Sequence, residues 1–141
     1  MENFESSTEA DQEARRREIG LRAKRRALKD REYQICAVIT GTTAYVIFTL
    51  CMSAIGFFSN GILVGAAIPL IFASGLSYTI YSIWRPSKWR PIMSAIPVVL
   101  FVLLEAVLGG WSDKPFWLAD VGLGGIFYLW RVRQEIAAVP N

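Results

Sequence analysis

The fold is decided by the stretch YQICAVITGTTAYVIFTLCMSAIGFFSNGILVGAAIPLIFASGLSYTIYSIW, residues 33–84. It contains no Asp, Glu, Lys, Arg or His. Its length is about two and a half times the roughly 20 residues that a helix needs to cross a hydrocarbon core. Helices of soluble proteins keep a polar face toward water, which a stretch of this composition does not provide. We therefore predict an all-α integral membrane protein.

Four apolar segments can be distinguished along the chain. The connectors between them, SNG, RPSKWRP and WSDKP, are rich in residues that end helices. Because short connectors make consecutive helices antiparallel, the sequence predicts four transmembrane helices in two hairpins. The predicted spans are about 33–58, 61–84, 92–110 and 116–130, within one transmembrane domain over 33–131. A charged cytoplasmic helix over 1–32 precedes this domain, and a short cytoplasmic tail over 132–141 follows it.

The distribution of Lys and Arg predicts the orientation in the membrane. Cytoplasmic loops carry an excess of these two residues. The amino-terminal arm holds nine of them, the middle connector three and the end of the chain two, whereas the two opposite connectors share only Lys114. We therefore expect a multi-pass protein with both termini in the cytoplasm, in a bacterial inner membrane or an equivalent membrane.

The amino-terminal arm has the pattern of a charged helix. Ser6 and Glu9 have the spacing of a capping box, and two Glu–Arg pairs four residues apart follow them. Two interpretations stay open: a solvated helix resting on anionic phospholipid headgroups, or a docking arm for an acidic partner protein. Nucleic acid is not expected, because basic residues without a binding fold are weak evidence for it. The candidate docking residues are Arg15, Arg16, Arg17, Arg22, Lys24, Arg25, Arg26, Lys29 and Arg31.

Two carboxylates, Glu105 and Asp120, lie inside predicted membrane segments. Glu105 lies five residues before Gly110 and Asp120 four residues after Phe116, so the hairpin places both about 6–8 Å below the outer surface. Acidic residues in membrane helices usually face the bundle interior and mark functional sites. Three roles stay open: a structural polar contact, a contact with a partner subunit or bound cofactor, and proton or cation transport.

Small residues recur at helical spacing and predict close packing of helices. Small side chains let two helix backbones approach each other, either within the bundle or between copies of a homo-oligomer. We predict no cofactor, although the glycines that follow Asp120 leave room for a bound lipid or a flat hydrophobic ligand. The candidate packing glycines are Gly41, Gly61, Gly65, Gly122, Gly124 and Gly125.

The residue inventory argues against an enzyme. The chain has no histidine, which removes His-ligated haem, most zinc sites and every Ser–His or Cys–His nucleophile pair. Cys36 and Cys51 lie 15 residues apart on one predicted helix, about 22 Å, and a disulfide spans only about 7 Å between Cα atoms. We therefore predict neither a catalytic site nor a metal site.

These observations favour a non-catalytic small membrane subunit. Such a subunit would pack beside other membrane subunits and stabilise or assemble a larger respiratory, photosynthetic or transport complex. The alternative is a small oligomeric transporter or channel in which Glu105 and Asp120 handle a proton or cation.

Overall fold

The computed structural model describes residues 2–108 and 118–140, and side chains over 11–103 and 120–140. The described residues form four helices: α1 over Glu2–Ser59, α2 over Leu63–Ile83, α3 over Arg90–Leu108 and α4 over Leu118–Ala138. All regular structure within the described ranges is helical. This confirms the predicted all-α class.

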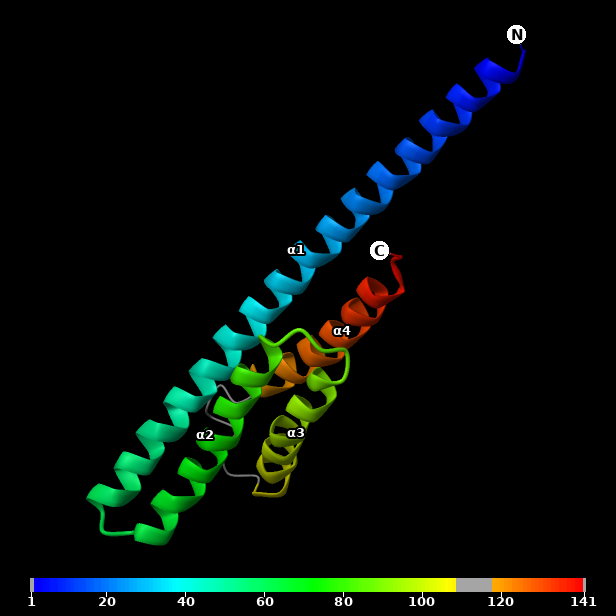
Figure 1. The fold of residues 1–141 in the computed structure, drawn as a ribbon. Helices are drawn as coiled ribbons and strands as arrows, with labels where there is room; N and C mark the ends of the chain where they lie inside the picture. Colours follow the sequence, from blue (N-terminus) through cyan, green and yellow to red (C-terminus); the bar gives the residue numbers. More distant parts are fainter. Residues whose placement is uncertain (1, 109–117, 141) are drawn as a thin grey trace.

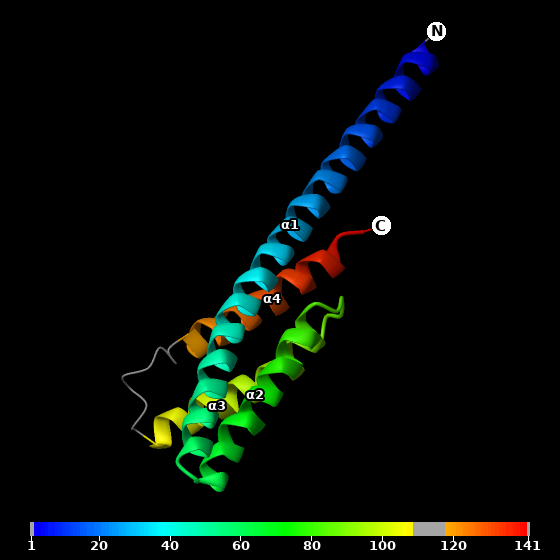
Figure 2. The same ribbon diagram turned by 90° about the vertical axis from the view of Figure 1, so that its left-hand side faces the viewer.

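The four helices form an antiparallel bundle in which neighbours along the chain are neighbours in space. α1 packs against α2 and α4, and α3 packs against the same two helices from the other side. Both ends of the chain lie at the same end of the bundle (Figures 1 and 2). The α2–α3 connector also lies toward this end, whereas the α1–α2 turn lies at the opposite one (Figure 1).

Helix α1 is continuous through the boundary predicted near residue 32. It has 58 residues, which corresponds to about 87 Å at 1.5 Å per residue. No proline interrupts it, and its amino-terminal half projects beyond the bundle (Figure 1). The helix already begins at Glu2, so the prediction that Ser6 caps its amino terminus is wrong.

The α1–α2 turn is built on Gly61. This residue has φ 75°, a left-handed conformation that costs other residues more than it costs glycine. The Ile62 amide donates to the Phe57 carbonyl and the Gly61 amide to the Phe58 carbonyl, both at 3.0 Å. This is the Schellman pattern of a helix carboxyl end. The sequence SNG therefore makes a turn tight enough to return α2 along α1.

A continuous apolar core joins the four helices. The α2–α3 contact is close, because a Cβ placed on Gly75 would lie 3.3 Å from the Pro97 Cβ. Thr79 of α2 also donates a hydrogen bond of 2.9 Å to the Ser94 carbonyl of α3, and its side chain is fully buried. The core residues are Cys36, Ile39, Val46, Leu50, Ala73, Leu76, Ile83, Ala95, Val98, Phe101, Ile126 and Leu129.

Helix α4 extends past the predicted end of the fourth span at residue 130. It continues to Ala138, so the segment described above as a tail is mostly helical. Val132 and Val139 are buried and Ile136 is half-buried along this extension. The apolar residues keep a helical spacing of four and three, which explains why the helix persists beyond the apolar segment.

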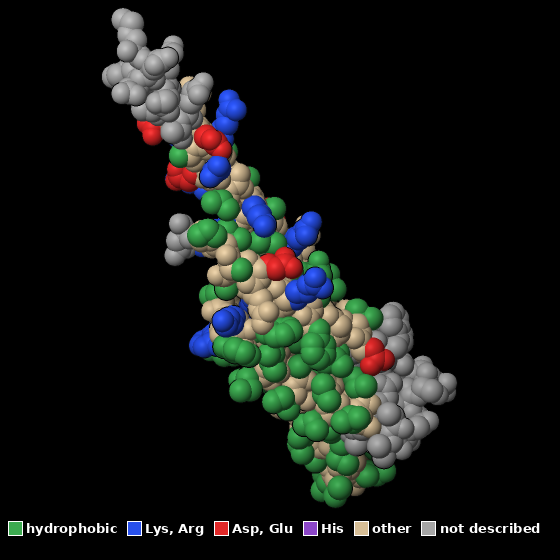
Figure 3. Space-filling view, turned by 90° about the vertical axis from the view of Figure 1, so that its right-hand side faces the viewer, with side chains coloured by type: hydrophobic (Ala, Val, Ile, Leu, Met, Phe, Trp, Pro, Cys, Tyr) green, Lys and Arg blue, Asp and Glu red, His purple; other side chains and the backbone are tan. Residues whose placement is uncertain are grey.

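Within the part of the chain that the structure describes, two helices are long and apolar enough to cross a membrane: the Asp11–Ser59 part of α1, and α2. The described part of α3, Arg90–Leu103, is apolar but shorter. Large apolar side chains are exposed on every helix, among them Phe48, Ile71, Met93 and Phe127. Hydrophobic side chains cover the bundle half of the visible face, whereas Lys, Arg, Asp and Glu gather mainly toward the projecting half of α1 (Figure 3).

Candidate functional site at the charged end of the bundle

A buried ion pair joins α1 to α4 at the charged end of the bundle. Arg133 Nε donates to Glu32 Oε1 at 2.6 Å. The Arg133 side chain is 6 % exposed and that of Glu32 is 23 % exposed. A guanidinium withdrawn from water to this degree needs compensation from several acceptors.

Arg133 finds those acceptors on the backbone at the end of α2 and in the connector that follows it. Its Nη2 donates to the Ile83 carbonyl, and its Nη1 donates to the Ser87 carbonyl at 3.3 Å. Carbonyls at the end of a helix have no partner inside the helix and carry its negative partial charge. Arg133 therefore links three parts of the fold: α1 through Glu32, the end of α2, and the α2–α3 connector.

Aromatic side chains surround this linkage. The rings of Tyr33 and Trp84 meet edge to face, with centroids 5.5 Å apart. The Trp84 indole N–H donates to Thr40 Oγ1 at 2.9 Å. On the α2–α3 connector, the Arg85 guanidinium lies 4.5 Å from the centre of the Tyr81 ring. Aromatic rings that combine an apolar body with a polar atom are typical of the membrane–water boundary.

Two open cavities flank the ion pair. One of about 300 Å³ is lined by Lys29, Tyr33, Cys36 and Trp84, and the other, of about 230 Å³, by Ser87, Lys88, Ile136 and Ala137. Glu32, Pro86 and Arg133 line both cavities. Each cavity thus has one lysine beside an ion pair that is already satisfied.

Among the described side chains of the basic arm, contact with the bundle lies at the base of the arm. Arg25 Nη2 donates to the Val139 carbonyl at 3.3 Å, and Leu28, one turn further along α1, is buried. Residues 11–24 are all exposed. The predicted pairs are confirmed: Arg17 bonds Glu13 and Arg22 bonds Glu18, each at 2.5 Å.

The other candidate docking residues of the arm differ in their exposure. Arg25 is half-buried. The exposed residues are Arg15, Arg16, Lys24, Arg26, Lys29 and Arg31.

The two predicted intramembrane carboxylates are not brought together by any described contact. Asp120 lies in the first turn of α4 and is exposed. Glu105 belongs to α3, but its side chain lies outside the described residues. In the part of the chain that the structure describes, no group of three or more His, Cys, Asp or Glu residues could hold a metal ion. Cys36 and Cys51 are both free thiols.

The candidate packing glycines occupy three kinds of environment. A Cβ on Gly125 would lie 2.8 Å from Ile39 Cγ1, and a Cβ on Gly65 would lie 2.9 Å from Ile62 Cγ2. A Cβ on Gly122 would make ordinary contacts of 3.7 Å with hydroxyl oxygens of α1. A Cβ on Gly41 or Gly124 would meet nothing within 4 Å, and Gly61 serves the turn. Close approach of α1 and α4 thus depends on Gly125.

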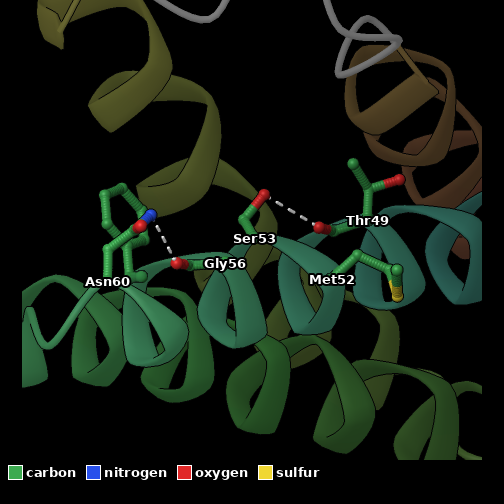
Figure 4. Close-up of a pocket in the computed structure, with 6 residues that line it drawn as sticks. Thr49, Met52, Ser53, Gly56 and Asn60 are labelled. Carbon is green, nitrogen blue, oxygen red and sulfur yellow. Dashed lines mark hydrogen bonds between the residues drawn. The ribbon is translucent and has the colours of Figure 1, made fainter.

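A larger cavity, of about 520 Å³, lies at the opposite end of the bundle (Figure 4). Ser53 donates to the Thr49 carbonyl at 3.0 Å, and Asn60 donates to the Gly56 carbonyl at 2.9 Å. The Thr49 hydroxyl likewise donates to a carbonyl of α1. These three polar groups thus donate to backbone carbonyls of α1.

The Glu32–Arg133 pair is the feature that the sequence analysis missed. In the sequence, Arg133 counts only as a positive charge that sets the orientation, and Glu32 has no assigned role. A usable signal existed, because Glu32 immediately precedes the first apolar segment and Arg133 closely follows the last. Opposite charges at the same end of two antiparallel helices are natural partners.

No protein-family model, curated protein or solved structure matches this chain.

Proposed function

We propose that the chain is a non-catalytic subunit of a larger membrane complex, with four transmembrane helices and both termini in the cytoplasm. The apolar surface supports the membrane part of this proposal. Soluble monomers rarely expose contiguous apolar patches beyond a few hundred Å². Here exposed apolar side chains occur on all four helices, including Val64 and Ile71 of α2, which are 77 % and 68 % exposed. Lipid is the solvent that suits such a surface.

The charge distribution supports the orientation. The basic arm, the α2–α3 connector and the end of α4 all lie toward one end of the bundle (Figures 1 and 2). The α1–α2 turn at the opposite end carries no charged residue. Because basic residues are retained on the cytoplasmic side, the charged end belongs in the cytoplasm.

The unbroken course of α1 carries the functional proposal. The helix passes from the apolar bundle into the basic arm without interruption, and the Glu32–Arg133 pair braces it against α4 at this junction. A braced helix holds the arm away from the bundle as a rigid rod, which suits contact with another protein. Glu32 and Arg133 line both cavities at the charged end and already bond each other, so we assign this end to binding.

The experiment has two steps. Extraction of membranes with alkaline carbonate should leave the full chain in the membrane fraction, and cysteines introduced at Ala14 and Ser59 of a cysteine-free variant should label from opposite sides. Native membranes solubilised in digitonin should then yield a particle in which this chain and other membrane proteins occur in fixed stoichiometry. Release by carbonate would contradict the membrane assignment. Isolation of the chain by itself, as a monomer or homo-oligomer, would contradict the subunit assignment.

The transporter alternative stays a prediction that rests on Glu105 and Asp120. Flux of protons or cations in liposomes, lost in Glu105→Gln, would favour it over the subunit assignment.

A further inference from the structure

Five residues of the arm form one straight stripe along α1. Arg15, Ile19, Arg22, Arg26 and Lys29 follow one another at steps of four, three, four and three residues. At about 100° per residue they lie within an arc of roughly 80°. All five are exposed, and Ile19 is 67 % exposed. We call this surface the basic stripe.

The basic stripe faces away from the bundle. Leu28 and Glu32 mark the side of α1 that meets α4, since Leu28 is buried and Glu32 bonds Arg133. These two residues lie roughly 100–140° around the helix from the centre of the stripe. The bundle therefore leaves Arg15, Ile19, Arg22 and Arg26 uncovered, whereas Lys29 at the base of the stripe also lines the cavity beside the ion pair.

The outer part of the stripe lies too far from the membrane surface to bind headgroups. If Tyr33 marks the boundary of the apolar bundle, Arg15 lies 18 residues further out, about 27 Å along the helix. Arg22 lies about 16 Å out by the same measure. Interactions between exposed charges are largely screened beyond about 8 Å at physiological ionic strength. Because α1 is braced by α4, we expect the arm to stay away from the lipid surface.

Acidic residues on the flanks of the basic stripe restrict the class of partner that can bind it. Glu18 and Asp30 lie on opposite sides of it, each roughly 60° from its centre. Beyond these acids lie Arg25 on one side and Arg16 on the other, roughly 80–100° from the centre, so each edge of the stripe carries one acid within a basic arm. A nucleic acid presents phosphates over a broad surface and would meet both acids, whereas a single helix would not.

Existing pairing within the arm does not neutralise the stripe. Glu18 bonds Arg22, but the two side chains are 60 % and 72 % exposed. Pairs this exposed contribute little to stability and are readily exchanged for another partner. Residues 15–31 contain nine basic and two acidic side chains, so most of the positive charge has no acidic counterpart within this stretch.

We propose that the basic stripe docks an acidic α-helix of a partner polypeptide. Alternating steps of three and four residues are the spacing at which two helices pack along a common seam. Carboxylates at the same spacing would face the four cations, and an apolar residue would cover Ile19. The inference rests on the proposed function, because a subunit of a complex requires a contact surface.

The test uses the full-length protein in phosphatidylcholine nanodiscs. The probe is a fluorescent helical peptide with Glu at steps of three and four residues and one Leu at the position facing Ile19. Three further probes test the other partners. A peptide of the same composition in scrambled order tests charge attraction alone, a DNA duplex tests nucleic acid, and nanodiscs that also contain phosphatidylglycerol test anionic headgroups. The stripe variant combines Arg15→Glu, Arg22→Glu and Arg26→Glu. The matched control combines Arg16→Glu, Arg17→Glu and Lys24→Glu, which changes the net charge equally on other faces of the arm.

We expect the peptide with Glu at steps of three and four residues to bind more tightly than the scrambled peptide. Its dissociation constant should rise at least about tenfold in the stripe variant and less than about threefold in the control variant. Equal loss in both variants, or equal binding of both peptides, would show charge attraction alone and overturn the proposal. Tighter binding of the duplex, or arm binding only to phosphatidylglycerol, would also overturn it. Circular dichroism of each variant checks that the fold is kept. These outcomes are independent of the native-membrane particle, so the stripe and the subunit assignment fail separately.

Discussion

Glu32 and Arg133 lie 101 residues apart in the chain, yet their side chains form a hydrogen-bonded ion pair of 2.6 Å at the base of the projecting helix. The pair stands near the point where α1 leaves the apolar bundle, and contact with α1 continues beyond it to the hydrogen bond between Arg25 and the Val139 carbonyl. Its geometry couples the direction of the arm to the packing of α4. The arm is therefore oriented by the bundle and not merely attached to it.

Removing one partner of this pair should destabilise the fold strongly. In Glu32→Ala the Arg133 guanidinium stays buried with only the carbonyls of Ile83 and Ser87 as acceptors. We expect a loss of about 3 kcal/mol in the free energy of unfolding, the lower end of the range for breaking buried pairs, because these carbonyl bonds persist. Unfolding in mixed micelles, followed by circular dichroism, measures this loss.

The control is the exposed pair between Arg131 and Glu135, whose side chains are 76 % and 51 % exposed. Glu135→Ala should change the free energy of unfolding by less than about 1 kcal/mol. Similar losses in Glu32→Ala and Glu135→Ala would show that the Glu32–Arg133 pair does not brace the arm.

Gly125 should be intolerant of even a methyl group. A Cβ there would lie 2.8 Å from Ile39 Cγ1, and Ile39 is fully buried in the core. Gly125→Ala should therefore destabilise the protein by about 1–3 kcal/mol through overpacking. The neighbouring Gly124→Ala meets nothing within 4 Å and should be neutral or stabilising by up to about 1 kcal/mol, because alanine favours the helix. Thermal unfolding in detergent compares the two, and a greater loss at Gly124 would contradict the α1–α4 contact.

The hydrogen bond from Thr79 to the Ser94 carbonyl should stabilise the α2–α3 contact. Thr79→Val keeps the shape of the side chain and removes the donor, so we expect a loss of about 0.5–2 kcal/mol. Ser74 bonds only a carbonyl of its own helix within the described contacts and is exposed, so Ser74→Ala serves as the control and should change little. An equal effect of both substitutions on the denaturant midpoint would argue against the contact between the helices.

The sequence predicted helices correctly where the composition of one continuous segment is enough to identify them. The uncharged stretch over 33–84 contains the carboxyl-terminal part of α1 and all of α2, and the connector SNG forms the turn between them. The prediction ends the fourth helix too early, because the run of apolar residues is interrupted at Arg131. The helical spacing of Val132, Ile136 and Val139 continues past that residue. The continuity of α1 was also hidden, because a change of composition near residue 32 resembles a boundary although nothing there breaks a helix.

The candidate site was less predictable than the fold, because it depends on contacts between distant segments. The Glu32–Arg133 pair needs the relative heights of α1 and α4, and the different roles of Gly124 and Gly125 need the rotation of α4 about its axis. A single sequence contains the residues but not that rotation. The basic stripe is an exception. Its residues follow steps of three and four in the sequence, so they can be placed on one face as soon as α1 is known to be a continuous helix.

Gly61 should be required for the tight turn between α1 and α2. At φ 75° a β-branched side chain is strained, and a left-handed conformation costs about 1–2 kcal/mol for residues other than glycine. Gly61→Val should therefore lower stability by at least about this amount, whereas Gly61→Asn should cost less because asparagine tolerates the same region. No heavy atom lies within 4 Å of the Cβ position, so the effect reports backbone conformation and not crowding. Equal unfolding midpoints for the two variants would contradict a turn held by the Gly61 backbone.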